Sequence, residues 1–179
     1  MCFNLQASLI AGSIGVTSGA LMRTSIGIFV IWYSMVQFAE AALYAGCMRA
    51  VWDRILLILL GSQLGVFTAV TWVPNNPYYK AMAVGGAALT LYSAVAPMQP
   101  KESKGGVEYA FTDTSSRLMF IQYAIIFAAA AAQSQYRCVA GVLFVTLIAS
   151  LVARPYANAS LWCWSSAVAA PVLLLACKS

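Results

Sequence analysis

The sequence predicts an all-α protein, a polytopic membrane helix bundle of about seven transmembrane helices that forms one unit over residues 1–179. Of the 179 residues, 62% are hydrophobic and only 8% are charged, and the mean hydropathy is +0.81. A soluble domain carries about 45–50% apolar and about 25% charged residues. This chain therefore has too few charged side chains to cover a water-facing surface, whereas lipid tolerates an apolar exterior. We expect an integral, multi-pass membrane protein whose partner is the lipid bilayer.

Seven hydrophobic segments have lengths near the roughly 20 helical residues that cross a hydrocarbon core of about 30 Å. They cover residues 5–22, 26–46, 52–72, 79–95, 117–132, 136–152 and 160–176. The first is rich in small residues, and the spacing of Gly15 and Gly19 suits close contact between helices. The first, fourth and seventh segments are short for a full span, which tilt or local thinning of the bilayer accommodates.

Polar and proline-containing segments separate these helices. Residues 73–77 hold two prolines and two asparagines, which predict a turn. Residues 97–116 form the longest polar stretch, where we expect an extramembrane loop. We name the membrane side of the N-terminus face A and the other side face B. The bundle ends assigned to face A carry six of the ten Lys and Arg residues, and this bias favours a cytoplasmic N-terminus.

The formal net charge of +5 does not indicate nucleic-acid binding. The basic residues lie singly at helix ends, apart from Lys101 and Lys104 in the polar loop. This distribution is typical of side chains that reach toward lipid headgroups, whereas a nucleic-acid surface needs clustered charge.

Glu40 is the leading candidate for a functional group. It lies well inside the second segment, and a carboxyl group inside a membrane is costly enough to indicate a functional site. Gln37 precedes it by one turn, and Tyr33 and Tyr44 are near the same stripe. Such a group could carry protons, bind a cation or hold a polar ligand. The alternative is a structural hydrogen bond, or an ion pair with Arg154 or Arg54, that holds helices together.

Alternating spans place many polar and aromatic residues in the face A half of the bundle. They are Cys2, Asn4, Gln37, Glu40, Tyr44, Asp53, Arg54, Arg117, Gln122, Arg154, Trp162, Cys163 and Trp164. This concentration suggests a cavity that opens to face A. The alternative is that helix ends are polar everywhere.

Cysteine and histidine usage limits the chemistry that the chain can perform. The five cysteines are scattered without a CxxC pair, so no zinc knuckle or thioredoxin-type site is indicated. Cys2 and Cys163 could meet as a disulfide, a soft-metal site or packed thiols, and packing is favoured because two cysteines alone rarely hold a metal. Alternatively, Cys2 is acylated. The chain has no histidine, which excludes Ser-His-Asp and Cys-His catalysis and histidine-bound zinc. We expect no enzymatic activity, no metal and no cofactor.

Several short motifs resemble an uncharacterised family of small seven-helix membrane proteins from bacteria, algae and large DNA viruses. The start of the chain, Met-Cys-Phe-Asn-Leu-Gln-Ala-Ser, is similar to the family's opening Met-Cys-Phe-Ser-x-x-Ala-Ser, with Asn4 in place of the usual serine. Gln37 and Glu40 match its Gln-x-x-Glu, and Trp162-Cys163 matches its entry to the last helix. The family has no assigned activity, so the resemblance implies topology and highlights Cys2, Gln37, Glu40 and Cys163.

Three functions follow from these observations as hypotheses. The leading one is a membrane protein that transports, conducts or senses a small polar solute or a proton through a face A cavity containing Glu40. The second is a structural or assembly protein of a membrane, such as a viral one, without transport activity. The third and weakest is a lipid-acting membrane enzyme, because no nucleophile–base pair stands out. A homo-oligomer is compatible with all three.

Overall fold

The structure is a computed structural model that describes residues 5–46, 48–98, 113–153 and 167–176. Within these ranges every secondary-structure element is a helix, which confirms the predicted all-α class. The helices are α1 (Leu5–Leu21), α2 (Ile26–Tyr44), α3 (Arg49–Gly61), α4 (Gln63–Val70), α5 (Pro77–Val95), α6 (Asp113–Ala132), the 3-10 helix η1 (Ser134–Tyr136), α7 (Arg137–Ala153) and α9 (Ala170–Ala176). Helical residues occur in each of the seven hydrophobic segments.

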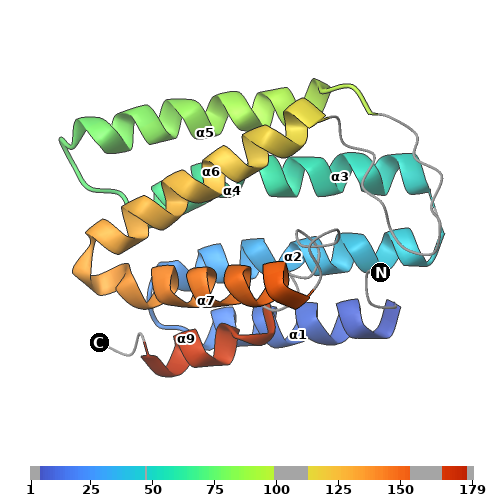
Figure 1. Cartoon of the computed structure of the whole chain (residues 1–179), viewed down its shortest axis with the longest axis horizontal. Coiled ribbons are helices and arrows are strands. Elements are labelled where there is room, and N and C mark those ends of the chain that lie inside the picture. The colour runs from blue at the N-terminus through green and yellow to red at the C-terminus, as the bar shows by residue number, and fades with distance from the viewer. Residues whose placement is uncertain (1–4, 47, 99–112, 154–166, 177–179) are drawn as a thin grey trace.

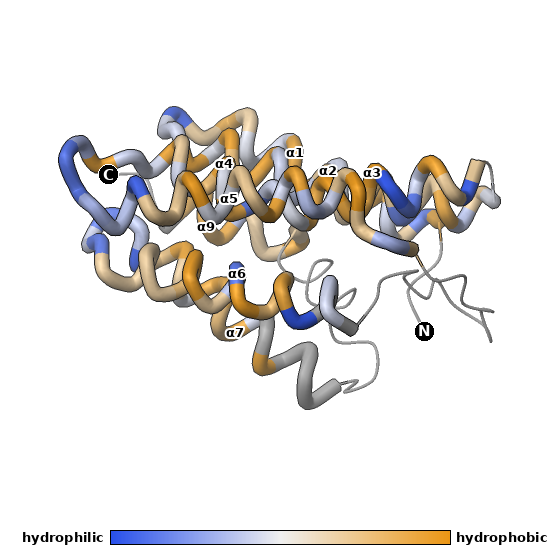
Figure 2. The backbone as a smooth tube through the Cα atoms, turned by 90° about the horizontal axis from the view of Figure 1, so that it is seen from above, coloured by the Kyte–Doolittle hydropathy of each residue, from blue (hydrophilic) through white to orange (hydrophobic). Residues whose placement is uncertain are grey.

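The helices run back and forth along the long axis of the molecule (Figure 1). The connections at residues 22–25, 71–76 and 133–136 lie at one end, and the end of α2 and the start of α3 lie at the other. We call these the face B end and the face A end, after the membrane sides at which the sequence predicts them. α1, α2, α3 with α4, and α5 form a row of neighbours. α6 and α7 form a second layer against this row, and α9 packs on α1 (Figure 2).

The third predicted helix differs most from the expectation. The sequence predicts one helix over residues 52–72, whereas the structure contains α3 and α4 with a break at Ser62. The helix also begins earlier, at Arg49. Hydropathy alone does not reveal the break, because apolar residues continue on both sides of it.

The helical start of α6 corrects the boundary of the predicted polar loop. α6 begins at Asp113, so residues 113–116 of the loop predicted over 97–116 are helical. Residues 99–112 lie outside the described ranges. Residues 113–116 read Asp-Thr-Ser-Ser, and such residues are favoured at helix starts because their side chains satisfy free backbone N–H groups. A boundary drawn from hydropathy therefore falls too late.

Two of the described helical stretches are long and apolar enough to cross a membrane. They are Ile26–Tyr44 and Arg49–Val70, and a third arises if the bent pair Arg117–Ala132 and Ser134–Thr146 counts as one span. The bend in that pair is 118°. Leu5–Leu21 is apolar but shorter, about 25 Å long at 1.5 Å per residue. The prediction of about seven spans is therefore supported only in its coarser form, an all-helical chain with two or three candidate spans.

Glycines allow the closest helix contacts of the row. A Cβ atom on Gly15 of α1 would lie 2.0 Å from Ser34 Oγ of α2, and one on Gly19 would lie 2.7 Å from the Gly27 carbonyl oxygen. Only a residue without a side chain fits such a contact, which agrees with the expectation from the spacing of Gly15 and Gly19. α4 and α5 meet in the same way, since a Cβ on Gly86 would lie 2.6 Å from the Gly65 nitrogen.

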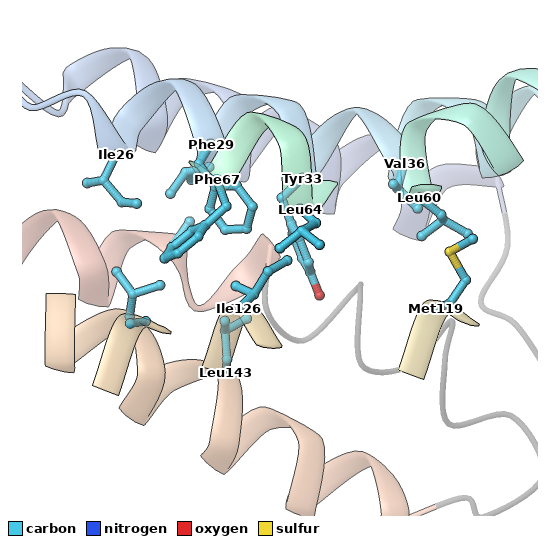
Figure 3. Close-up of a cluster of buried hydrophobic side chains, with 14 of the residues drawn as sticks. Ile26, Phe29, Tyr33, Val36, Leu60, Leu64, Phe67, Met119, Ile126 and Leu143 are labelled. Carbon is cyan, nitrogen blue, oxygen red and sulfur yellow. The ribbon is translucent and has the colours of Figure 1, made fainter. Parts of the chain in front are cut away.

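The hydrophobic core lies between the helix row and the second layer (Figure 3). The rings of Phe29 from α2 and Phe67 from α4 pack edge to face with centroids 5.2 Å apart, a favoured arrangement for aromatic pairs. Ile126 of α6 and Leu143 of α7 complete this cluster. α2 is therefore enclosed by α1, α3, α4 and the core, which determines the surroundings of its polar residues.

Candidate functional site

The polar stripe of α2 lies inside the bundle. Gln37 is 0% exposed and Glu40 is 1% exposed, and Tyr33 is also buried. Tyr44 is partly buried near the face A end of the same helix. The Glu40 carboxyl group is thus enclosed by protein rather than facing a surrounding lipid. A group in that position can exchange protons or hydrogen bonds only with other protein groups or with small molecules that enter the bundle.

The amide of Gln37 is the least satisfied polar group of this stripe. Neither its Nε2 nor its Oε1 has a hydrogen-bond partner among the described residues. The same is true of Gln63 at the start of α4, which is also 0% exposed. A glutamine amide offers two donors and an acceptor oxygen, and leaving a buried polar group unpaired costs about 1–3 kcal/mol. Two such amides in one bundle indicate places where water or a polar molecule would be stabilised.

Arg54 does not pair with Glu40 among the described contacts, which corrects one of the alternatives drawn from the sequence. Its Nη1 atom donates to the carbonyl oxygens of Ser93, at 3.1 Å, and Ala96, at 2.8 Å. These carbonyls lie at the C-terminus of α5, where free C=O groups attract a cation. Asp53 is instead approached by Arg49, with Nε 3.7 Å from Oδ2. The other proposed partner, Arg154, lies outside the described residues.

Gln122 of α6 enters the break between α3 and α4. Its Nε2 donates to the Leu60 carbonyl oxygen, and its Oε1 accepts from the Leu64 N–H at 3.4 Å. In a continuous α-helix the N–H of residue 64 would donate to the carbonyl of residue 60. The side-chain amide therefore replaces a backbone hydrogen bond across the break, an arrangement known to interrupt helices.

α2 holds the same break from the other side. Trp32 Nε1 donates to Ser62 Oγ at 2.8 Å, and Ser62 Oγ in turn donates to the Leu59 carbonyl oxygen at 3.2 Å. Neither the roles of Ser62 and Gln63 nor the bridging role of Gln122 was predicted from the sequence. The available signal was Gly61-Ser62-Gln63, a small-polar-polar run inside an otherwise apolar segment.

A pocket of about 680 Å³ lies between α5 and α6 near the face B end. It is lined by Leu64, Val73, Asn76, Tyr78, Tyr79, Ala81, Met82, Gly85, Ile125, Ala128, Ala129, Ala132 and Gln133. Gln133 Nε2 donates to the Tyr79 hydroxyl at this end. The pocket is thus at the opposite end of the bundle from Glu40. The face A cavity suggested by the sequence stays a prediction.

The cysteines form the remaining group of candidate residues. Cys2 and Cys163 lie outside the described ranges, and their packing stays a prediction. Cys138, at the start of α7, forms a disulfide bond, which the sequence analysis did not predict. Within the described part of the chain no three Cys, Asp or Glu side chains come together as metal ligands.

Comparison with protein-family models, with curated proteins and with solved structures finds no match to this chain. The resemblance to the small seven-helix family accordingly stays a prediction.

Proposed function

We propose that this protein is a polytopic integral membrane protein whose buried α2 stripe binds or passes a small polar solute or a proton. Residence in a membrane is supported by large apolar side chains that face outward from the described helices. They include Ile10 on α1, Val84 and Leu91 on α5, and Val145 on α7, each between 59% and 71% exposed. A soluble monomer rarely exposes such large apolar areas, whereas lipid tails cover them at no cost.

The observation that carries the proposed activity is the completely buried amide of Gln37, which lies one helical turn from Glu40 and has no hydrogen-bond partner among the described residues. A hydrogen-bonding molecule at this point would satisfy the Gln37 amide. It would lie about one helical turn from the carboxyl group of Glu40. Gln63 is a second buried amide without a hydrogen-bond partner among the described residues, and its neighbour Ser62 accepts a hydrogen bond from Trp32 of α2. Such a succession of buried polar groups suits a proton relay or a small neutral solute.

The test is flux through the full-length protein in liposomes. We expect Glu40→Gln to lower proton flux, measured with an internal pH-sensitive dye, or urea flux, measured by light scattering, at least tenfold. Asp53→Asn is the matched control, because it makes the same carboxyl-to-amide change near the same end but outside the α2 stripe. Wild-type flux no greater than that of protein-free liposomes would rule out the transport proposal, and so would equal fluxes for wild type and Glu40→Gln.

A structural or assembly role is the second candidate, and a specific set of contacts favours it. Gln122, Trp32 and Arg54 each use their polar groups to join one helix to another. If Glu40 serves in the same way, Glu40→Gln should lower the melting temperature without any flux being present in the wild type. No described contact favours a lipid-acting enzyme. We also propose that the N-terminus is cytoplasmic, which topology mapping would test. A homo-oligomer is compatible with the proposal, and a mass measurement in detergent would test it.

A further inference from the structure

The break between α3 and α4 interrupts one of the candidate membrane spans. The stretch Arg49–Val70 has 22 residues, and Ser62, where α3 gives way to α4, lies in its middle third. Interrupted backbone at membrane depth is tolerated only where protein buries it or where it lines a polar cavity. In membrane transporters, interrupted helices near the bilayer midplane supply the sites for small solutes. The break therefore has the position that a solute site occupies in such proteins.

Two neighbouring helices use polar side chains to hold the break. Trp32 Nε1 of α2 donates to Ser62 Oγ at 2.8 Å. The amide of Gln122 on α6 donates to the Leu60 carbonyl oxygen and accepts from the Leu64 N–H. These side chains therefore have their hydrogen bonds within the protein, and they keep the break at the junction of α2, α4 and α6.

Gln63 differs from these neighbours. It is the first residue of α4 and is 0% exposed, and neither its Nε2 nor its Oε1 has a hydrogen-bond partner among the described residues. Its amide is best satisfied by one molecule that accepts from Nε2 and donates to Oε1. A small amide does both, because its C=O and N–H groups lie side by side. A cation would satisfy only Oε1, and an anion would satisfy only Nε2.

The charges around the break also favour a neutral ligand. Glu40 is eight residues from Trp32 on α2, and Arg54 is eight residues from Ser62 on α3. Eight residues correspond to about 12 Å along a helix. Arg54 already donates to two carbonyl oxygens of α5, and the basic residues of α5 and α6 are exposed. An ion at Gln63 would therefore be buried without a close counter-charge, which is costly.

We infer that the break between α3 and α4 binds a small neutral amide of the size of urea, through the side chain of Gln63. The inference rests on the proposed function and deepens it, because it adds a second binding point to the α2 stripe and selects a neutral solute over a proton. Gln63 is then a residue that determines specificity, since its amide favours molecules that offer a donor and an acceptor together.

Binding is tested with urea on the full-length protein in detergent micelles, by NMR of its ¹⁵N-labelled glutamine side chains. The signal that is lost in Gln63→Leu identifies Gln63, and Gln63→Asn identifies it if the leucine variant fails to fold. We expect urea to shift this signal saturably. Gln135, exposed in η1, is the matched control, and its signal, identified with Gln135→Leu, should not shift saturably. No shift at Gln63, or equal shifts at both positions, would overturn the inference.

Solute selection is tested by flux in liposomes. Gln63→Leu should lower urea flux at least tenfold, whereas Gln135→Leu should keep the wild-type flux. Proton or water flux without urea flux in the wild type would contradict the inference. A loss of flux in Glu40→Gln but not in Gln63→Leu would contradict it too, and would leave the proposed α2 site standing. Saturable urea binding at Gln63 without any flux would rule out transport but not the binding site, so the two failures are distinguishable.

Discussion

At the scale of single residues, the buried glutamines of this protein fall into two groups. The Gln122 amide is paired with Leu60 and Leu64, whereas the amides of Gln37 and Gln63 have no hydrogen-bond partner among the described residues. Hydropathy and position placed Gln37 and Glu40 inside an apolar helix but did not determine whether they would face a cavity, a packed neighbour or lipid. In the structure both are buried within the bundle. The sequence could not predict which amides would be paired, because their partners come from helices distant along the chain.

Replacing Gln37 with leucine should stabilise the protein while lowering flux. The two side chains are of similar size, and the change removes a buried unpaired amide whose burial costs about 1–3 kcal/mol. We expect a higher melting temperature in detergent and at least a tenfold loss of flux in liposomes. A lower melting temperature would mean that the amide has a structural partner. Unchanged flux would mean that the polar molecule, if one enters, does not use Gln37.

At the scale of elements, the break between α3 and α4 is the feature that the sequence least disclosed. The apolar pattern predicted one helix over 52–72, yet side chains from two other helices, α2 and α6, meet at Ser62 and its neighbours. Trp32 binds Ser62, and Gln122 bridges the backbone on either side. The start of α6 at Asp113 was missed for a different reason. Polar residues of the kinds favoured at helix starts have the same low hydropathy as a loop.

Gln122→Leu should destabilise the protein, opposite in sign to Gln37→Leu. The same chemical change here leaves the Leu60 carbonyl and the Leu64 N–H without the side chain that pairs them, unless the helix closes its own hydrogen bond. We expect a loss of about 1–3 kcal/mol in the free energy of unfolding, measured by denaturation in mixed micelles. An unchanged or raised stability would show that the break closes into a continuous helix and that the amide is not needed to hold it open.

At the scale of the whole molecule, the order and direction of the helices were predictable, and the layers were not. Alternating apolar segments and turns predicted a chain that runs back and forth, which Figure 1 displays. The placement of α6 and α7 as a second layer depends on side chains from distant parts of the chain, such as Phe67 and Ile126, that belong to one buried cluster (Figure 3). Length and hydropathy alone support only two or three spans, because helices such as α5 carry polar residues near their ends.

Accessibility to a water-soluble thiol reagent would decide how many helices lie within lipid. Cysteine introduced at Leu91 of α5 or Val145 of α7 would be 70% or 65% exposed on the protein surface, and neither helix qualifies as a span by itself. If lipid covers these faces, such cysteines should add no label in intact membranes above the wild-type background counted by mass spectrometry, and should become reactive in denaturant. A cysteine at Asn75, exposed in the 71–76 connection, is the positive control and should react at once.

The Asn75 cysteine should also react with an impermeant reagent added outside the cell if the N-terminus is cytoplasmic. Rapid labelling at Leu91 and Val145 would mean that water reaches these faces, and the bundle would then contain no more membrane spans than α2, the α3–α4 pair and the bent α6–α7 pair.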